Sequence, residues 1–556
     1  MRTDLVLPLV LLALTSGSRV IAQPAPPVPA APEVLRLTVD QAVTMALDSN
    51  LDLAADRLDP AIGDTQMAVA AASFRPSVSS SLQRNNQLQP PSNFLFPIAT
   101  RTDVVTSTVG VNQYLPWFGT SYSASWDSSH TDSNSVLNSY NPLVRSGLSL
   151  NVSQPLLRDL AVDGPRLQMA TSQLNRQAVG TRLRESEVRT AASVKAAYWN
   201  LVSAHANVEA RRTALELAEE LARVNKAKVD VGLSPPLDLV SAQAEVASSQ
   251  EQRIIAETSV KQAEDRLRLL IFDTTERRNW TVAIQPVDSP PVAVVALDVE
   301  AAVTTALRDR ADLVRARIGV QTADSVVKYA GNQRLPDVRV NAAYQASGLG
   351  GTEVLRAGGF PGTVVGPGAV TRYGSVLDQL FRSDYPTWAV GLSVSYPIGQ
   401  SVQEATFARS KLERAQADAR VKSAEGRVIQ QIRDAAWKVE MNAKRVDTSR
   451  VVATLAEQRL DAERKRFEVG LSTSFLVIQA QRDFVQATTN ELSAVLAYDL
   501  ALVDFEALQL AGPAGQAPAA VPASSAAVPA GPGSSAPPGG AGRINTATSL
   551  TGIPGL

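Results

Sequence analysis

Two patterns of apolar and polar residues alternate along the chain, and the first is helical. The runs 166–231 and 402–469 contain no proline and one glycine each. Their apolar residues recur in steps of three and four, as in Val428, Ile432 and Ala435, which is the spacing of one face of an α-helix. At a rise of about 1.5 Å per residue, a helix of this length reaches roughly 100 Å. We therefore expect two very long helices with seams suited to coiled-coil packing.

Each long helical run leads into nearly the same sequence. VDVGLSPPLDLVSAQ occupies residues 229–243, and FEVGLSTSFLVIQAQ follows 238 positions later at residues 467–481. The glycine of each copy suits the left-handed backbone that ends a helix, and the serine two positions on is placed to cap the next helix: Gly232 with Ser234, and Gly470 with Ser472. We predict tight turns between antiparallel helices, with returning helices over 235–271 and 473–510.

The second pattern has a period of two and precedes each long helix. It covers segments within 74–157 and 334–397, which predicts β-strands rich in serine and threonine. Aromatic residues gather near the strand ends, namely Tyr114, Trp117, Phe118, Tyr122 and Trp126 in one half and Tyr385, Trp388 and Tyr396 in the other. Alternating segments of about ten residues with aromatic ends are typical of a membrane β-barrel. We expect loops over about 89–102, 129–143 and 347–384, the last of them flexible and glycine-rich.

The first half contains strand-forming sequence that the second half lacks. Residues 108–129 are interpreted as two strands around LPWFG, which would be an additional hairpin. A hairpin returns the chain to the side that it left, so it can join a barrel without changing the rest. Whether it joins stays open at this point; if both strands join, each chain supplies six strands rather than four.

The same order of elements occurs twice, which indicates an internal duplication. LTVDQAVTMALDSNLDLAADR opens the first half at 37–57, and LDVEAAVTTALRDRADLVRAR opens the second at 297–317. We divide the chain into a signal peptide at 1–22, a proline-rich linker at 23–36, a first repeat at 37–290, a second repeat at 291–510, and a disordered tail rich in alanine, glycine and proline at 511–556.

Composition argues against several classes of function. The net charge of −1 gives no strong attraction to nucleic acid. There is no cysteine, which excludes disulfides, thiolate metal sites and a cysteine nucleophile. His130 and His205 stand alone, without the partners that a metal site or a catalytic triad would need. We therefore predict no catalytic residue, no metal and no cofactor, and we do not expect an enzyme.

The N-terminus MRTDLVLPLVLLALTSGSRVIAQ is typical of a secretory signal peptide. Arg2 supplies a short positive region, residues 5–14 form an apolar core, and Val20-Ile21-Ala22 is an acceptable cleavage site. No later stretch has 18 consecutive apolar residues, so we expect no transmembrane helix. An exported chain of this kind that enters a membrane would do so as a β-barrel.

The duplicated order of helix, strands, very long helix, VGLS turn and long helix, together with strand ends such as LNVSQPLL, resembles the TolC-like outer membrane factor family over about residues 35–510. The resemblance implies a mainly α fold in which long antiparallel helical hairpins form an α-barrel and strands from three chains share one membrane β-barrel. It also implies a homotrimer in the bacterial outer membrane lipid, with a periplasmic helical tunnel. Function would then be passive conduction in efflux or type I secretion, with a periplasmic adaptor protein and an inner-membrane pump as partners.

The resemblance also implies where partners dock and where the entrance narrows. The docking positions would be the turn residues Val231, Gly232, Leu233, Ser234, Val469, Gly470, Leu471 and Ser472. Some family members close the entrance with acidic rings after the second turn, but this chain has Leu476 and Gln479 at the matching positions. Asp238 holds the equivalent place after the first turn, where it could form a carboxylate ring or simply favour the start of its helix. A hydrophobic constriction at Leu476 is equally compatible.

A periplasmic coiled-coil adaptor or structural protein is the alternative class. It would share the signal peptide and the helical hairpins. It would be expected to have one hairpin flanked by small β-domains, rather than two copies that each follow alternating strands. The distinguishing observation is whether the alternating segments present an apolar face to lipid.

Overall fold

The computed structural model describes residues 34–91, 99–135, 138–273, 275–289, 296–359, 362–399 and 401–513. The predicted signal peptide, most of the predicted linker and nearly all of the predicted tail lie outside the described residues. The described residues form two compact units, each assembled from three stretches of sequence: those within 34–51, 193–289 and 442–500, and those within 52–192, 296–441 and 501–513. We describe the first as the turn unit and the second as the sheet unit.

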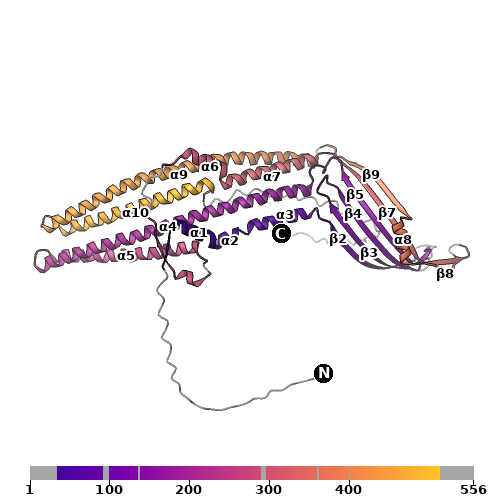
Figure 1. Ribbon diagram of the computed structural model, residues 1–556, viewed down its shortest axis with the longest axis horizontal. Helices are drawn as coiled ribbons and strands as arrows, with labels where there is room; N and C mark the ends of the chain where they lie inside the picture. The colour runs from indigo at the N-terminus through magenta and orange to yellow at the C-terminus, as the bar shows by residue number, and fades with distance from the viewer. Residues whose placement is uncertain are drawn as a thin grey trace, which may run out of the picture. The chain divides into compact units, whose positions relative to one another are not determined.

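Four long helices dominate the fold, and they keep the period of the sequence repeat. They are α4 (Gly164–Asp230), α5 (Pro236–Ile271), α9 (Val402–Glu468) and α10 (Ser474–Leu510). Helices α4 and α9 each have 67 residues, and α9 begins and ends 238 positions after α4. Figure 1 shows α4 followed by α5, and α9 followed by α10, as two helical hairpins. A mainly α fold with duplicated helical hairpins is therefore confirmed.

The turn unit contains a small two-stranded sheet beside the helices. Strand β1 (Val34–Leu37) pairs in parallel with β6 (Ala283–Pro286), next to the short helix η1 (Arg277–Trp280). Helix α1 (Val39–Ser49) begins with a capping box between Thr38 and Gln41. The last residues of the predicted linker, 34–36, are thus part of a strand. They pair because the apolar side chain of Leu37 reaches a core that also holds Leu201, Leu267, Ile271 and Ile284.

The sheet unit holds shorter helices that lead into the strands. These are α2 (Leu51–Asp56), α3 (Asp59–Ala72), α6 (Val299–Asp309) and α7 (Ala311–Gln333). Arg310, at the junction of α6 and α7, is 1% exposed. Its guanidinium lies 3.0 Å from the Asp312 carboxylate and donates to the Gln431 side chain at 2.6 Å. A buried charge needs such partners, so this arginine ties both short helices to α9.

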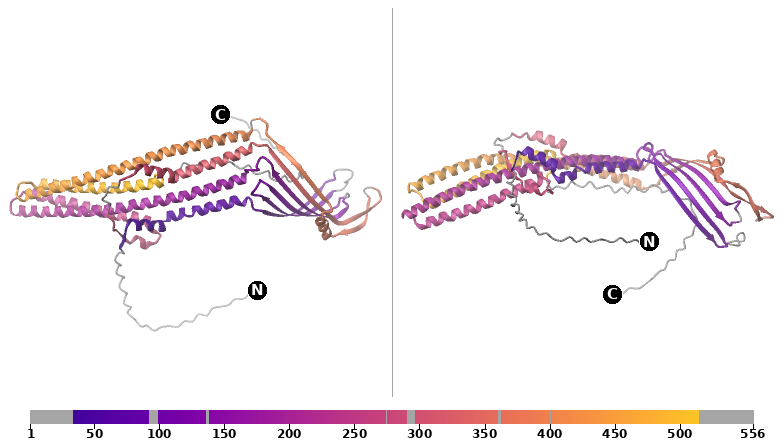
Figure 2. Two further views of the ribbon diagram at one scale, coloured as in Figure 1. Left: turned by 45° about the horizontal axis from the view of Figure 1, so that its top comes forward. Right: turned by 60° about the horizontal axis from the view of Figure 1, so that its bottom comes forward.

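One large antiparallel sheet contains the remaining strands. Their order is β2 (Ser77–Gln89), β3 (Thr100–Tyr114), β4 (Ser121–Ser133), β5 (Tyr140–Pro155) and β7 (Asp337–Ala357). The free edge of β7 then pairs with two strands in succession, β9 (Pro386–Ser395) along residues 337–346 and β8 (Thr363–Thr371) along residues 351–357. The sheet is thus six strands wide, and Figure 2 shows the strands side by side.

The additional hairpin of the first half is an integral part of this sheet. Strands β3 and β4 pair with each other from Thr102 to Tyr114, and each also pairs with its outer neighbour, β2 or β5. The loops on either side are shorter than predicted, because β3 already begins at Thr100 and β4 continues to Ser133. The first half therefore supplies four of the six strands across the sheet. The second half supplies the other two, namely β7 and, beside it, β9 followed by β8.

The glycine-rich segment 347–384 is not the flexible loop that we predicted. It contains the end of β7, the whole of β8 and the helix α8 (Tyr373–Arg382). Two glycines of β7 explain the difference, because they lie directly under α8. A Cβ atom at Gly348 would stand 2.3 Å from the Val376 carbonyl oxygen, and one at Gly350 would stand 2.5 Å from a Val376 methyl group. The glycines permit close packing of a helix rather than mobility.

Among the described residues, none of the helices combines the length and the apolar character needed to cross a membrane.

Candidate functional site

Both hairpins end in turns of the same backbone geometry. Leu233 N–H donates to the Lys228 carbonyl at 2.7 Å, and Leu471 N–H donates to the Arg466 carbonyl at 2.8 Å. Each bond spans five residues, as in a Schellman motif, and each motif contains a glycine with positive φ. The φ angles are 74° at Gly232 and 79° at Gly470, so the predicted left-handed glycines are confirmed.

The predicted serine caps are wrong. The residue at the N-cap of α5 is Pro235, and its side chain makes no capping hydrogen bond. Helix α10 begins later, at Ser474, and the Ser472 hydroxyl donates instead to the Glu463 carboxylate at 2.7 Å. This hydrogen bond lowers the pKa of Glu463. Capping is dispensable in the first turn because Pro236, at the first helical position, has no N–H that needs a partner.

The turns carry exposed apolar side chains. The exposed fractions are 68% for Val231, 77% for Leu233, 69% for Val469 and 74% for Leu471. Neither turn glycine has any atom within 4 Å of the place where a Cβ would stand. The structure thus places the predicted docking residues at two solvent-exposed turns, and the space beside the glycine of each turn is open.

Below the turns, polar contacts join the two hairpins. Asn225 is completely buried, and its amide donates to the Ser474 hydroxyl at 2.6 Å and to the Asp238 carbonyl at 3.3 Å. The Lys228 ammonium donates to the Phe467 carbonyl at 3.0 Å and lies 3.5 Å from the centre of the Phe467 ring. These contacts are not predictable from the sequence, since a single asparagine or lysine in a long helix carries no distinguishing pattern.

Apolar and charged contacts continue this junction away from the turns. Leu221, Phe467, Val477 and Ile478 form a buried cluster. Farther along, the Arg482 guanidinium pairs with the Glu245 carboxylate at 2.6 Å. In this way α4 and α5 of one hairpin contact α9 and α10 of the other, so the two turns are held next to each other.

The predicted entrance residues lie within the first two turns of the returning helices. Asp238 is in the first turn of α5 and is partly exposed. Leu476 is 44% exposed. The Gln479 amide donates to the Asp483 carboxylate at 2.9 Å, and the Arg459 guanidinium donates to the same carboxylate at 3.0 Å. Asp483 is an acidic group that sequence reasoning missed, although it lies only one helical turn beyond Gln479.

The sheet has two faces of opposite character, and the strand register defines them. Trp126 pairs with Leu148, Leu148 with Ala346, and Tyr344 with Trp388. Because side chains alternate along each strand, these rows belong to one apolar face. Its members include Val78, Leu82, Val109, Val111, Ala124, Leu150, Val152, Val340, Val390, Leu392 and Val394.

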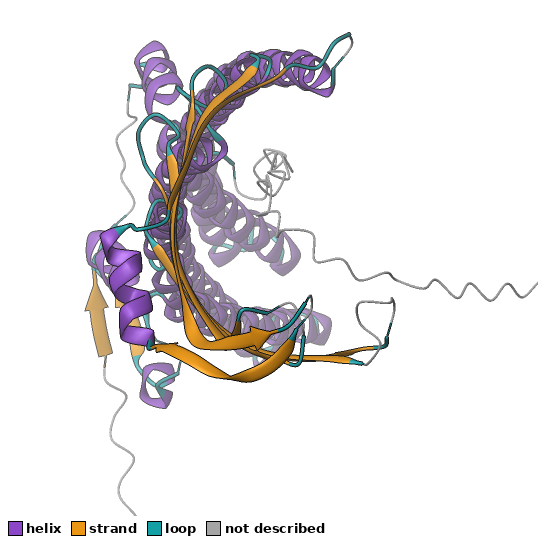
Figure 3. Cartoon of the chain, turned by 90° about the vertical axis from the view of Figure 1, so that its right-hand side faces the viewer, coloured by secondary structure: helices purple, strands orange, loops and turns teal. Residues whose placement is uncertain are grey.

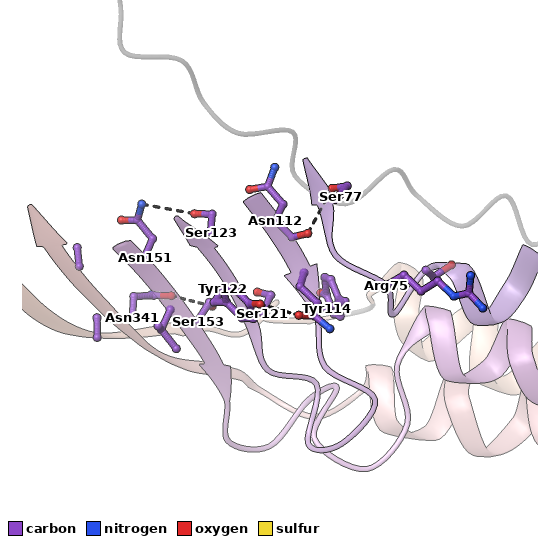
Figure 4. A pocket seen from close by; sticks show the side chains of 15 residues that line it. Arg75, Ser77, Asn112, Tyr114, Ser121, Tyr122, Ser123, Asn151, Ser153 and Asn341 are labelled. Atoms are coloured by element: carbon purple, nitrogen blue, oxygen red, sulfur yellow. Dashed lines mark hydrogen bonds between the residues drawn. The ribbon is translucent and has the colours of Figure 1, made fainter. Parts of the chain in front are cut away.

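The opposite face is lined with small polar side chains. It includes Ser79, Ser81, Thr108, Ser125, Asp127, Ser149, Gln345 and Ser393. Figure 4 shows Ser77, Asn112, Ser123 and Asn151, from four neighbouring strands, projecting to one side and lining a hollow. Figure 3 shows the sheet as a curved wall with the short helix α8 against its convex side. Helix α8 packs on Gly348, which pairs with Ser146 of β5. Ser146 lies two residues before Leu148 and therefore on the same face, so the convex face is the apolar one.

The sequence matches a known protein family over most of the helices and strands described above. The family model described as outer membrane efflux protein matches residues 110–271 and 302–509, well over half of the chain. The chain belongs to the outer membrane efflux protein family. No curated protein sequence matches it.

Solved outer membrane channels share the fold of this efflux protein. The channel protein CusC superposes with a TM-score of 0.62 at 14% identity, over 85% of this chain and 92% of its own. CmeC, an outer membrane channel of Campylobacter jejuni, gives 0.58 at 15% identity, over 85% of both chains. The outer membrane protein VceC of Vibrio cholerae gives 0.58 at 16% identity, over 85% of this chain and 96% of its own.

The family assignment agrees with the two faces of the sheet. The efflux protein is an outer membrane channel component whose helical part lies in the periplasm, and the periplasmic adaptor class is not favoured. The family is one of channels and not of enzymes. Within the described ranges, no group of three or more His, Asp or Glu side chains is placed to hold a metal ion.

Proposed function

We propose that three copies of the efflux protein form one passive conduit across the outer membrane. The supporting observation is a sheet with an apolar convex face, a polar concave face and two open edges, β2 on one side and β9 on the other. In lipid, open edges leave backbone N–H and C=O groups without partners, so each edge requires a strand from another copy. Three sheets of six strands would close an eighteen-stranded barrel, a size that encloses an aqueous channel.

Transport through such a barrel needs no chemistry from the protein. The concave face offers hydroxyl and amide groups, such as Ser125 and Asn151, that can exchange contacts with water and with polar solutes. This surface has few charges and many similar small groups, which suits a conduit of low selectivity. Energy for transport comes from an inner-membrane pump, to which a periplasmic adaptor connects the conduit.

We propose that the adaptor or the pump docks on the two hairpin turns. The support is that Val231, Leu233, Val469 and Leu471 expose apolar side chains beside glycines with open space around them. A partner hairpin can approach such a backbone closely and cover these side chains. Gly232, Ser234, Gly470 and Ser472 complete the docking surface.

We further propose that the conduit narrows at the residues that follow the turns. Leu476 and the neighbouring Phe475 are 44% and 69% exposed, which favours an apolar constriction once threefold symmetry brings three copies together. Asp238 adds a carboxylate in the first turn of α5, and Gln479 adds an amide in the second turn of α10. Substitution of Leu476 by serine is expected to increase the conductance of the reconstituted trimer, whereas Asp238→Asn is expected to change its cation preference.

Native mass analysis of the protein extracted from outer membranes tests the assembly. We expect a trimer that requires detergent to stay in solution. A soluble periplasmic monomer or hexamer would contradict the conduit and would favour the adaptor class.

Site-specific photo-crosslinking in cells tests the docking surface. A photoreactive residue at Leu233 or Leu471 is expected to capture a periplasmic adaptor or an inner-membrane pump component. The matched control is Leu412, which is 72% exposed but lies near the start of α9, at the end of that helix away from the turn. Equal capture at all three positions, or capture only at Leu412, would remove the turns as the docking site.

A further inference from the structure

Helix α8 packs on the apolar, convex face of the sheet, where a barrel meets lipid. Val376 is completely buried and Leu380 is 2% exposed, and both point into the sheet. The helix covers Gly348 and Gly350 of β7, which share a face with Leu148 and Trp126. A helix in this position is outside the conduit, so transport itself does not explain it.

Three side-chain hydrogen bonds fix the direction of α8 across the strands. At its start, the Tyr373 hydroxyl donates to the Ser128 hydroxyl of β4 at 3.0 Å. At its end, the Tyr344 hydroxyl of β7 donates to the Ser383 hydroxyl at 2.8 Å. In between, the Leu349 N–H, which lies beyond the part of β7 that pairs with β9, donates to the Gln379 side chain at 3.1 Å. The helix therefore crosses from β4 to β7 instead of following a strand.

The same contacts define the two flanks of α8. Gln379 faces Leu349, which is five residues farther along β7 than Tyr344 and so nearer the end of the sheet distant from the helices. At 100° per residue, Phe381 lies about 160° around the helix from Gln379, on the opposite flank. That flank, which also carries Leu377, faces along the sheet toward its apolar rows. Phe381 is 78% exposed.

Two tyrosines that flank β9 show how far the apolar band extends. Tyr385 and Tyr396 are 61% and 58% exposed, and between them Val390, Leu392 and Val394 face outward. From Tyr385 to Tyr396 an extended chain advances about 36 Å, which at a tilt of about 40° gives a height of about 28 Å, close to the roughly 25 Å of an outer membrane apolar band. Arg382, the last residue of α8, precedes Tyr385 by three positions. The helix therefore lies at the distal border of this band.

We propose that α8 is an interfacial helix that binds outer-leaflet lipid at the border of the barrel. Phe381 and Leu377 contact the upper part of the acyl chains. Asp378 and Arg382, which pair at 3.1 Å on the side away from the sheet, lie at the level of the polar headgroups. Helix α8 packs on β5 and β7, and the apolar row of β7 pairs directly with the outward-facing row of β9. The helix thus shares the face that the barrel presents to lipid, which favours lipid over a second copy as the partner. The proposal rests on the membrane location of the proposed conduit.

Spin labels at single cysteines test this placement, because the chain has no cysteine of its own. The variants are Phe381→Cys, the α8 control Ser375→Cys, the lipid-facing control Leu392→Cys and the polar-face control Ser393→Cys. Each is reconstituted as the full-length protein in phospholipid vesicles, and the collision rates of the label with oxygen and with a water-soluble nickel chelate are measured. We expect the oxygen-to-nickel ratio at Phe381 to lie between those at Leu392 and Ser393, and to exceed the ratio at Ser375.

Each contrary outcome has a distinct meaning. A Phe381 ratio equal to that of Ser375 would place the flank in water and overturn the proposal. A Phe381 label that neither reagent reaches would show that a second copy covers the flank, which also overturns it. If Leu392 itself were accessible to the nickel chelate, the barrel would not face lipid there, and the conduit rather than the role of α8 would have failed.

Discussion

At the scale of single residues, the turns depend on the two glycines that alone can adopt their backbone conformation at little cost. Gly232 and Gly470 both have positive φ, and neither is crowded by other atoms. Their requirement is therefore conformational rather than steric. The chain offers matched controls in Gly180 and Gly426, which lie inside α4 and α9 and also have open space around them.

Substitution of Gly232 or Gly470 by alanine should destabilise the protein by about 1–2 kcal/mol, because alanine resists the left-handed conformation. Gly180→Ala and Gly426→Ala should instead stabilise it by about 0.5–1 kcal/mol, because alanine favours the helix. Thermal unfolding of the detergent-solubilised protein measures both effects. Destabilisation by all four substitutions would show that crowding in the assembly, and not backbone conformation, governs these positions.

A second single residue, the buried Asp499, makes the stability of the protein depend on pH. This residue of α10 is 3% exposed, and one of its carboxylate oxygens accepts no hydrogen bond from the described residues. Burial raises the pKa of Asp499 from 3.8 to about 7. Folding then disfavours the ionised form, so the contribution of this group to stability falls as the pH rises from about 4 to 7 and stays low above that range.

The variant Asp499→Asn should therefore be more stable than the wild type at pH 8, by on the order of 4 kcal/mol, and similar to it near pH 4. The midpoint of thermal unfolding at several pH values measures this. Asp504→Asn, an exposed position on the same helix, is the control and should leave the profile unchanged. A profile for Asp499→Asn that parallels the wild type would show that the Asp499 carboxyl is not desolvated.

At the scale of elements, the packing of α8 on β7 depends on the absence of two side chains. A Cβ atom at Gly348 or Gly350 would overlap Val376 of α8. The backbone oxygen of Val376 cannot rotate away, so the helix itself would have to move.

Gly348→Ala should loosen α8 from the sheet and accelerate hydrogen exchange over residues 373–383. Gly391→Ala is the matched control, since a Cβ there meets no atom within 4 Å and β9 is otherwise unchanged. Hydrogen–deuterium exchange with mass spectrometry on the reconstituted protein distinguishes the two variants. Unchanged protection of residues 373–383 in Gly348→Ala would show that α8 is held by other contacts, such as those of Tyr373 and Ser383.

The elements also show how far sequence reasoning reaches in this chain. The long helices were predictable within two residues, because proline is absent from 166–231 and 402–469 and the turn glycines mark their ends. Helix α8 was missed because its buried face consists of only Val376 and Leu380, in a segment whose glycines suggest a loop. The contact of Asn225 with Ser474 joins residues 249 positions apart, and no local pattern predicts such a pair.

At the scale of the whole molecule, the duplication is kept in the helices and altered in the sheet. The two hairpins retain the offset of 238 residues, whereas the strands of the first half outnumber those of the second across the sheet. Strand order and the pairing of β5 with β7 were beyond the sequence, since they join the two halves. The sequence left open whether each copy supplies four strands or six, and the pairing of β3 and β4 with their neighbours makes six.

The most direct test of the conduit is a cryo-electron microscopy structure of the protein in lipid nanodiscs. We expect a threefold particle with a closed barrel of eighteen strands, in which β2 of each copy pairs with β9 of the next. The apolar face of the sheet should contact lipid, and the polar face should line an open channel. A barrel of twelve strands, with β3 and β4 outside it, or a sheet that closes on itself in a single copy would contradict the account.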